Sequence, residues 1–559
     1  MRYKQAGLSM PATRRRRPPA GRPQRPTQPE TPAAAGSRAS GRLLWGPGLL
    51  ALTLVAVSFV PRVASNSALA GSFWAAGAVL FGWLAALGVW RGGETSARTL
   101  QVVLRPQHYL QAAVQGAVFL YWGFFWPPVY NHAWLLVAQL LFAYAFDMLL
   151  TWSRRERYAL GFGPFPIIFS TNLFLWFRDD WFYLQFLMLA AGFLGKELVR
   201  WQRDGRSTHI FNPSAFSLGL FSLLLIVTGT TDLTWGQDIA STLTLAPQIY
   251  LFLFAIGLIV MYAFSITLVA GSAAIVLFGS SALYSAVTGV PYFIDSEIPS
   301  AVFLGLHLLV TDPSTSPRTP IGKALFGALY GLAVFGLYSL LGAVGVPTFY
   351  DKLLCVPLLN LSVPVIDRVA LSLRQNGMFA TPGQWGANWG EGRANLVHVT
   401  VWVLFFGAMA ALGATDSQHR GDTVPFWEQA CAEDRPLACQ RLIQIESNYC
   451  GDNTGWACNE LGLHFTRGEI VNADPALAQD YFGQACEVRF QAGCLNLLVD
   501  GAQPGAGGLS PSDRNRIVRA NPRPLDLRLL LREAGPNLLD MPEPALYARA
   551  CNHGWTFAC

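Results

Sequence analysis

Long apolar runs limit what this chain can fold into more than any other feature. Runs of roughly 20 apolar residues, the length that a helix needs to cross a bilayer, recur from Leu43 to Leu412. The chain is 52% hydrophobic and only 13% charged, and an average soluble protein carries about twice that charged fraction. We therefore expect an all-α fold, a polytopic bundle of membrane-spanning helices. About thirteen spans are predicted, at residues 43–60, 69–90, 107–127, 133–152, 159–177, 182–199, 213–229, 247–264, 266–284, 298–311, 323–343, 350–366 and 395–414.

Positive charge predicts how the chain crosses the membrane. Residues 1–42 hold ten Lys or Arg, one acid (Glu30) and many prolines, which is typical of a disordered basic arm. Lys and Arg also gather in alternate connections between the spans, whereas the other connections carry almost none. Because the Lys- and Arg-rich side faces the cytoplasm, we expect a cytoplasmic N-terminus in the inner (plasma) membrane. An odd number of spans then puts residues 415–559 in the periplasm or outside the cell.

These signals divide the chain into six parts. The expected domains are a basic cytoplasmic arm at 1–42, two extra spans with a loop at 43–105, a transmembrane core at 106–372, a cytoplasmic loop at 373–394, a last span at 395–414 and an external domain at 415–559.

Eight of the nine cysteines fall in the tail, in four pairs of identical spacing. The pairs are Cys431/Cys439, Cys450/Cys458, Cys486/Cys494 and Cys551/Cys559. Residues eight apart on one straight helix are about 12 Å apart, but a disulfide needs Cα atoms within about 7 Å. A bonded pair therefore requires a turn between its members, which predicts helical hairpins, each held by one disulfide. Zinc is the competing use of paired cysteines, but it favours shorter spacings, so we expect disulfides and no metal.

Part of the tail resembles a known repeat family. Trp456-Ala-Cys-Asn-Glu-Leu-Gly and Tyr481-Phe-Gly-Gln-Ala-Cys486 are similar to cysteine-rich, tetratricopeptide-like repeats of the SEL/HCP type. Stacked helical hairpins offer concave surfaces for protein partners. The resemblance therefore implies that the external domain binds a protein partner.

Four ordered motifs mark the transmembrane core. They are Phe193-Leu-Gly-Lys196-Glu-Leu, His209-Ile-Phe-Asn212-Pro213-Ser-Ala-Phe, Thr311-Asp312-Pro313 followed by Ser314 to Lys323 and Phe326-Gly-Ala-Leu-Tyr-Gly331-Leu, and Asn360-Leu-Ser-Val-Pro364-Val-Ile-Asp367. Together they resemble the RnfD and NqrB family of membrane subunits from ion-pumping, flavin-carrying electron-transport complexes, including shortened relatives of the UnbU type. The match covers about residues 106–372, which are ten of the predicted spans.

The resemblance implies a redox role and a set of site residues. It implies FMN or another flavin as cofactor, a membrane location and other subunits of an electron-transport complex as partners. The cofactor-binding residues that it indicates are Lys196, His209, Asn212, Pro213, Thr311, Asp312, Thr315, Lys323, Asn360 and Asp367. Family members attach FMN to a threonine, but the comparable loop at 231–247 lacks that segment, and the fragment Gly413-Ala-Thr415-Asp makes Thr415 the remaining candidate.

Proline placement gives an independent physical argument for a cavity. Asn212-Pro213 and Asp312-Pro313 are both predicted to start helices, because proline lacks an N–H and the preceding side chain can cap free amides. Two broken helices about 100 residues apart are typical of transporters whose half-helix ends face a central site. Ordinary caps at ordinary membrane boundaries are the alternative.

Four further residues are weaker candidates. Asp147 lies within a span, where an acid is a functional candidate, but an ion pair with Arg154 and Arg155 is the alternative. His307 and His398 are candidate haem ligands, against the simpler expectation of hydrogen bonds between helices. Cys355 is expected to be a buried small hydrophobe. No nucleic-acid signature accompanies the basic arm.

Three functions fit these observations. The first is a redox subunit that holds a flavin or quinone between broken helices. The second is a redox-inactive transporter that moves a solute or ion through the same cavity. The third is a membrane scaffold that recruits a partner through its external domain.

Overall fold

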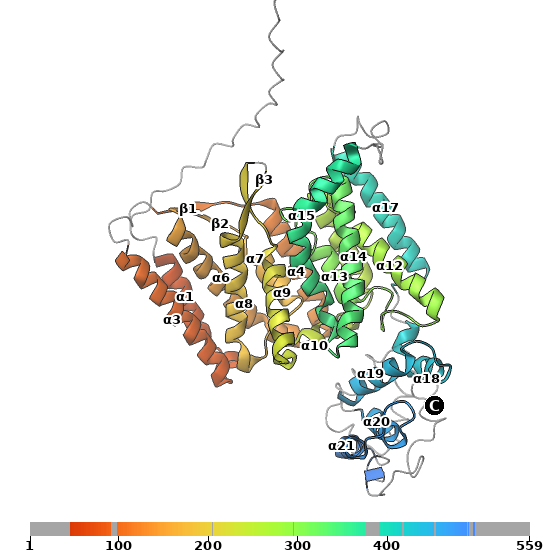
Figure 1. Ribbon diagram of the computed structural model, residues 1–559. Helices are drawn as coiled ribbons and strands as arrows, with labels where there is room; N and C mark the ends of the chain where they lie inside the picture. The colour runs from red at the N-terminus through yellow and green to blue at the C-terminus, as the bar shows by residue number, and fades with distance from the viewer. Residues whose placement is uncertain are drawn as a thin grey trace, which may run out of the picture.

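The computed structural model describes residues 45–90, 98–203, 205–294, 296–375, 391–415, 419–451, 454–488, 490, 493 and 496–497. Helices dominate this part of the chain (Figure 1), as the predicted helical class requires. Two small sheets add to it at one end of the bundle, which we name the strand face. The helices after residue 420 lie beyond the opposite end, which we name the tail face.

The helices of the apolar region are α1 (Trp45–Val57), α2 (Pro61–Ala64), α3 (Ser67–Trp90), α4 (Pro106–Phe125), α5 (Pro128–Asn131), α6 (Ala133–Arg154), α7 (Pro164–Asn172), α8 (Tyr183–Leu198), α9 (Pro213–Thr228), α10 (Gly236–Thr242), α11 (Ile249–Phe264), α12 (Thr267–Thr288), α13 (Ser300–Leu308), α14 (Pro320–Ala343), α15 (Asp351–Gln375) and α17 (Glu391–Ala411). Single 3₁₀ turns are η3 (Asp179–Trp181), η4 (Thr231–Leu233), η5 (Leu243–Leu245), η6 (Thr348–Tyr350) and η7 (Arg420–Asp422). The strands are β1 (Thr99–Val102), β2 (Arg157–Leu160), β3 (Arg200–Arg203) and β4 (Arg206–His209), and the tail helices are α18 (Val424–Ala432), α19 (Ala438–Gly451), α20 (Gly455–Arg467) and α21 (Pro475–Glu487).

Six of the described helices are long and apolar enough to cross a membrane. A seventh is added if 236–245 and α11, which meet at 101°, form one broken span. Large apolar side chains cover the outside of the helices of the apolar region, among them Phe124 of α4, Val227 of α9 and Val287 of α12, each more than 70% exposed. A soluble monomer rarely exposes apolar surface on this scale, so these helices are compatible with a multi-pass membrane protein.

The core contains two sets of five elements with the same order and the same neighbours. The first set is α4, α6, α7, α8 and α9, and the second is α11, α12, α13, α14 and α15. In each set the third element contacts the first and second, the fourth contacts the second, and the fifth contacts the fourth. This arrangement is similar to that of transporters built from two inverted repeats.

The third element of each set is a half-helix. The helices α7 and α13 have 9 residues each, so each is about 14 Å long in an apolar layer that is roughly 30 Å thick. The predicted spans 159–177 and 298–311 are therefore helical only in part, and non-helical chain completes them. The helix α7 follows β2 at the strand face, whereas α13 follows Glu297, which contacts His419 of the tail. The two half-helices thus enter from opposite faces.

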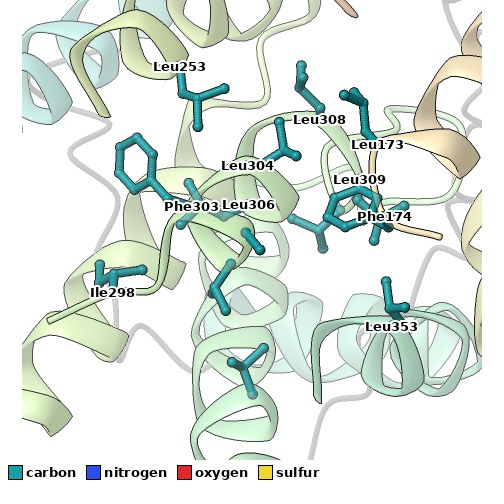
Figure 2. Close-up of a cluster of buried hydrophobic side chains, with 14 of the residues drawn as sticks. Leu173, Phe174, Leu253, Ile298, Phe303, Leu304, Leu306, Leu308, Leu309 and Leu353 are labelled. Carbon is teal, nitrogen blue, oxygen red and sulfur yellow. The ribbon is translucent and has the colours of Figure 1, made fainter. Parts of the chain in front are cut away.

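Apolar side chains fill the region where the half-helices end. Leu173 and Phe174 follow α7, and Leu309 follows α13; all three are fully buried, and they lie close together (Figure 2). Leu353 of α15 is also fully buried in this cluster. The centre of the bundle is therefore a packed core.

The two predicted extra spans are integrated into the bundle. The helices α1 and α3 pack on each other and on α6. At the tail face, the Arg62 guanidinium donates two hydrogen bonds to the Asp179 carboxylate, at 2.7 and 2.9 Å. Asn66 donates a hydrogen bond to Asp180 at 2.7 Å. These contacts fix the added helices against η3, which precedes α8.

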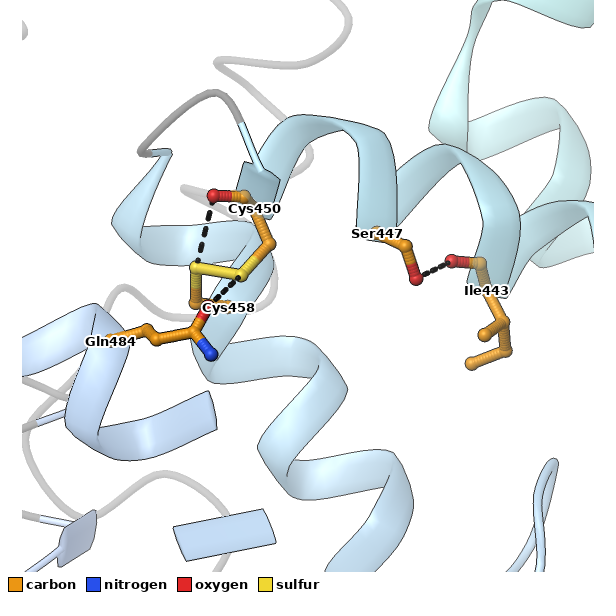
Figure 3. The surroundings of a disulfide bond; sticks show 5 residues. All are labelled: Ile443, Ser447, Cys450, Cys458 and Gln484. Carbon is orange, nitrogen blue, oxygen red and sulfur yellow. Dashed lines mark hydrogen bonds between the residues drawn. A yellow bond between two sulfur atoms is a disulfide. The ribbon is translucent and has the colours of Figure 1, made fainter. Parts of the chain in front are cut away.

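The tail consists of helical hairpins, and two of the predicted disulfides are confirmed. Cys431–Cys439 joins α18 to α19, and Cys450–Cys458 joins α19 to α20, with Cα atoms 4.6 and 4.7 Å apart. Gln484 of α21 lies against the second disulfide, with its Oε1 3.4 Å from the Cys450 Sγ (Figure 3). Cys486 is also disulfide-bonded. Cys494, Cys551 and Cys559 lie outside the described residues.

The tail docks on the connection that leads into α13. Arg435, in the turn between Cys431 and Cys439, donates a hydrogen bond to the Gly289 carbonyl at the end of α12, at 2.9 Å. His419 lies 3.6 Å from the Glu297 carboxylate, which also accepts a hydrogen bond from Ser281 at 2.6 Å. The nearby His419 is the main cause that lowers the pKa of Glu297 below its ordinary value.

Candidate functional site

A cavity of about 610 Å³ opens at the strand face and collects several predicted site residues. Its wall comes from the start of α4, the end of α6 with β2, the end of α8, β4 and the segment that follows α13. The lining residues are Val103, Arg105, Gln107, His108, Gln111, Asp147, Thr151, Arg155, Arg157, Tyr158, Ala159, Gly161, Gly163, Pro164, Lys196, Glu197, Arg200, His209, Asp312, Pro313 and Ser314.

The parallel pair β1–β2 forms one wall. Thr99 is opposite Arg157 and Val102 is opposite Leu160 in its register. The Val103 amide donates to the Leu160 carbonyl at 2.8 Å and continues the pairing toward α4. A Cβ on Gly161 would lie 2.2 Å from the Val103 carbonyl oxygen, so only glycine permits this close approach. The strand pair thereby brings two arginines to the cavity: Arg105, which follows β1, and Arg157, which begins β2.

Lys196 reaches the cavity from the last turn of α8. The preceding Gly195 lets α9 pack closely, because a Cβ there would lie 2.7 Å from the Phe216 ring. The start of α9 is thus held beside the end of α8. This packing explains why the Gly-Lys pair stands at the end of this helix.

Charges around the cavity divide into a paired and an unpaired group. Glu197 lies within 4 Å of three arginines: Arg154, Arg155 and Arg200. Lys196, Arg105 and Arg157 form no ion pair or side-chain hydrogen bond with the residues that the structure describes. Lys196 is half-buried, whereas Arg105 and Arg157 are exposed at the rim. The unpaired group is purely cationic.

Asp312, Ser314 and His209 form a hydrogen-bonded chain in the cavity wall. The Ser314 hydroxyl and amide donate to Asp312 Oδ1 at 2.7 and 2.9 Å. Because that hydroxyl has a single proton, the His209 Nε2, 2.9 Å from the Ser314 Oγ, must be the donor in their contact. His209 therefore carries its proton on Nε2.

The same contacts keep Asp312 ionised. Burial acts to raise the pKa of Asp312, but the nearby His209 and the hydrogen bonds from Ser314 outweigh it and lower the pKa below its ordinary value. A carboxylate that accepts two or three hydrogen bonds is stabilised in its charged form. Asp312 thus serves as a fixed acceptor that orients Ser314 and His209.

Asp147 lies in the cavity wall without the ion pair that was one of its two predicted roles. Its carboxylate accepts a hydrogen bond from the Tyr158 hydroxyl at 3.2 Å, whereas Arg154 and Arg155 contact Glu197. Burial and the neighbouring Asp147 raise the pKa of Tyr158, so its hydroxyl keeps its proton. The prediction of an Arg154–Asp147–Arg155 ion pair is wrong because Glu197 takes both arginines.

Asn212 and Asn360 make a buried polar layer next to the cavity. Asn212 caps α9 as predicted, accepting from the Ser214 amide at 3.1 Å. Its side-chain amide donates to the Leu309 carbonyl at 2.9 Å, and its own backbone amide donates to Asn360 at 3.1 Å. Asn360 in turn donates to the Thr315 carbonyl at 3.3 Å. These bonds join α9, α15 and the segment after α13.

Arg203 and Asp367 hold the same segment from its other side. The Arg203 guanidinium donates to Asp367 at 2.6 Å and to the Ser316 carbonyl at 3.1 Å. Asp367 also accepts from the Arg318 amide at 3.3 Å. Asp367 therefore acts by positioning residues 312–316 and does not line the cavity.

The prediction that Asp312-Pro313 starts a helix is wrong. The helix α13 ends at Leu308, and α14 begins at Pro320 with Thr319 as its cap, so residues 309–319 are non-helical. The Thr319 hydroxyl, not Asp312, accepts from the Gly322 amide at 3.0 Å. The helix begins at Pro320 and not at Pro313, because Thr319-Pro320 is a second pair of capping residue and proline and lies closer to the apolar run.

The remaining predicted residues lie apart from the cavity. The Lys323 amine donates to the Ser265 carbonyl between α11 and α12, at 2.7 Å. Thr311 donates to the His307 carbonyl at 2.5 Å, and the Pro213 carbonyl packs against Gly192. Thr415 lies in the turn after α17, at the tail face and hence at the opposite end of the bundle from the cavity.

The hydrogen bonds between helices that were expected of His307 and His398 are not formed among the described residues. His307 Nδ1 contacts the Phe303 carbonyl of its own helix at 2.8 Å, and its Nε2 is buried without a described partner. His398 is half-buried on α17, whereas the lone cysteine is as expected. Cys355 is free and buried. Among the described residues, no three His, Cys, Asp or Glu side chains are placed to hold a metal ion.

Several lining residues were missing from the predicted site. Arg105 and Arg157 were considered only among the Lys and Arg that predict topology, and Arg155 also as an alternative ion-pair partner of Asp147. Tyr158 was not predicted. Their signal was the density of Lys and Arg in alternate connections between the predicted spans, which is compatible with a binding site as well as with topology. No family model matches this chain, and no curated protein and no solved structure is significantly similar to it.

Proposed function

We propose that this chain is an integral membrane subunit of a redox-driven electron-transport complex, which holds a flavin or quinone in the strand-face cavity. The cavity that gathers Lys196, His209 and Asp312 carries the proposal. These residues come from three different motifs of the RnfD- and NqrB-like pattern and are as much as 116 positions apart in the sequence. The common location of three separate motifs supports a shared ligand.

The residues of the cavity fit a flavin nucleotide. Its volume of about 610 Å³ lies within the roughly 300–1,000 Å³ of most small-molecule sites. The cations can bind a phosphate, and His209 and Ser314 can exchange hydrogen bonds with a polar ring edge. A bound flavin would supply the electron-transfer chemistry. The protein would orient the ring, and the ionised Asp312 would hold Ser314 and His209 in position to contact it.

We also propose the membrane arrangement from the sequence. The core would have ten crossings, formed by α4, α6 to α9 and α11 to α15, if α7 and α13 each count as one crossing together with the non-helical residues that follow them. The helices α1, α3 and α17 would bring the total to thirteen. The strand face, with its arginines, would face the cytoplasm of a cell whose inner (plasma) membrane holds the chain. The tail would then lie in the periplasm or outside the cell, where disulfides persist and where it would bind a protein partner.

A solute or ion transporter is the second candidate. The opposed half-helices α7 and α13 favour it, since inverted repeats with broken helices are typical of secondary transporters. The apolar cluster of Leu173, Phe174 and Leu309 opposes it, because fully buried leucine and phenylalanine side chains close the centre of the bundle. We therefore prefer a bound cofactor to a moving solute.

Purified protein would separate the candidates. We expect yellow protein with a flavin absorption band whose chromophore is released by detergent extraction and acid. A flavin that stays with the chain after acid, in wild type but not in Thr415→Ala, would instead indicate covalent attachment at Thr415. Colourless protein that cannot be reconstituted with flavin or quinone, but passes solute in liposomes, would contradict the redox proposal.

A further inference from the structure

The cavity has more positive charge than its own acidic residues neutralise. Five lining side chains are Lys or Arg, and three are carboxylates. Glu197 is shared by the arginines that lie within 4 Å of it, including Arg155 and Arg200 of the lining. Glu197 is therefore already paired with these arginines and does not neutralise the other cations of the cavity.

The other two carboxylates are held by neutral or histidine donors. Asp312 accepts from Ser314 and lies 3.9 Å from His209. Asp147 accepts from Tyr158. Neither forms an ion pair within 4 Å with Lys196, Arg105 or Arg157 in the part of the chain that the structure describes. The three cations thus keep their hydrogen-bond donors free.

Free cations around a partly enclosed cavity favour a dianion. Like charges repel one another more strongly where protein replaces water, because the effective dielectric falls. A phosphate offers three acceptor oxygens, and charge-assisted hydrogen bonds to it are about twice as strong as neutral ones. Lys196 is half-buried and the arginines are exposed at the rim, so the phosphate would lie between the interior and the mouth.

We propose that the cavity selects ligands that end in a phosphate monoester, bound by Lys196 together with Arg105 and Arg157 at the rim. The inference rests on the proposed function in placing the cofactor in this cavity. It narrows the class of ligand: an uncharged quinone or riboflavin would leave the three cations unpaired, whereas the phosphate dianion of FMN would offset two of their three charges. The remainder of the ligand would contact His209, Ser314 and the α4 side of the cavity.

Flavin titration of the purified full-length protein in detergent tests the phosphate site. Ligand-stripped protein is titrated with FMN and with riboflavin, and binding is followed by quenching of flavin fluorescence. We expect FMN to bind about tenfold tighter or better, a gain typical of one charge-assisted contact. Lys196→Gln should remove most of this preference and leave riboflavin affinity unchanged, and Lys196→Arg should retain it. Inorganic phosphate should compete with FMN but not with riboflavin.

Arg154→Gln is the matched control. Arg154 is exposed, pairs with Glu197 and does not line the cavity, so its loss should leave both affinities unchanged. Size-exclusion profiles and melting temperatures verify that each variant folds.

The outcomes separate the two proposals. Equal affinity for FMN and riboflavin in the wild type, with no effect of Lys196→Gln, would overturn the phosphate site and leave the flavin function standing. Failure to bind any flavin, together with phosphate protection of Lys196 from amine labelling, would overturn the flavin function and retain the phosphate site. Failure of both flavin binding and protection would overturn both.

Discussion

The half-helices α7 and α13 have the same length and opposite directions, but the segments that follow them differ in chemistry. After α7, residues 173–177 are all apolar and buried. After α13, residues 311–316 are mostly polar, and Asp312 to Ser314 reach the cavity. The break after α7 is therefore closed by apolar packing, whereas the break after α13 is open to the cavity. The two sets of helices contain similar breaks, and only the second break carries polar groups into the cavity.

The closed copy is held by a buried cluster of amides. Asn172, the last residue of α7, contacts His132 and Gln139 at 3.0 Å through its Oδ1 and donates to Gln139 at 2.7 Å. Gln185 donates to Gln139 at 3.0 Å and accepts from the Phe177 amide at 3.1 Å. All four polar side chains are buried. They satisfy the polar groups of a chain break inside an apolar layer, where unpaired groups are costly.

The largest predicted effect concerns this cluster. Asn172→Leu removes the central acceptor and leaves amide groups of Gln139 and Gln185 unsatisfied, so we expect a loss of about 3 kcal/mol or more in unfolding free energy. Thr311→Val at the open copy removes one hydrogen bond and should cost about 1 kcal/mol. Thermal unfolding in detergent measures both. Equal losses would show that the two breaks do not differ in rigidity.

A second prediction concerns how each half-helix is anchored. The double variant Cys431→Ser, Cys439→Ser removes the staple around Arg435 and should lower tail stability by about 2–3 kcal/mol. Hydrogen exchange should rise at 289–297, which leads into α13, and stay unchanged at 161–164, which leads into α7. Unchanged exchange at 289–297 would show that the tail does not fix the open copy.

A third prediction tests whether Asp367 positions the segment 312–316 for the ligand, in contrast to a charged residue of the strand face that lies away from the cavity. Asp367→Asn weakens the contact with Arg203 and loosens residues 312–316, so we expect FMN affinity to fall about threefold and stability by about 1 kcal/mol. Lys323→Gln, which alters a contact with Ser265 away from the cavity, is the control and should leave affinity unchanged. If Lys323→Gln weakened FMN binding and Asp367→Asn did not, the ligand would lie beside α14 and not in the strand-face cavity.

The smallest effect concerns the pH dependence of the tail. His464 lies 3.1 Å from the buried Glu446 carboxylate. Burial acts to lower the pKa of His464, but the hydrogen bond and charge of Glu446 raise it above the ordinary value of about 6.5. The ion pair of His464 and Glu446 therefore contributes fully to the stability of the tail below about pH 6.5. Its contribution is lost as the pH rises through the raised pKa of His464.

The measurement is the melting temperature of the tail as pH rises from 6 to 9. We expect wild type to lose about 1 kcal/mol more than His464→Gln over this range. Parallel pH profiles for the two proteins would contradict the assignment. Because the strand face is distant from this pair, FMN affinity should not follow the same profile.

Sequence patterns predicted the elements that depend on local chemistry. Apolar length predicted the membrane helices, the Asn212-Pro213 cap is confirmed, and cysteine spacing predicted two of the observed hairpin staples. Lys196, His209 and Asp312 were predicted as site residues and do share a cavity. Each of these signals is contained in a few neighbouring residues or in one ordered motif set.

What the sequence did not predict depends on long-range pairing. Hydropathy alone cannot tell a full span from a half-helix followed by buried non-helical chain, so α7 and α13 were not recognised as half-helices. The pairing of β1 with β2, which brings Arg105 and Arg157 to the cavity, joins segments more than 50 residues apart. Asp312 was taken for a helix cap because its local pattern matches that of Asn212, and only the position of α14 distinguishes them.

The most direct test of the account is an electron-microscopy map of the full-length protein with FMN. The account predicts ligand density between the start of α4 and residues 312–314, with the phosphate end beside Lys196. Clear flavin density at the tail face near Thr415, with the strand-face cavity empty, would contradict it.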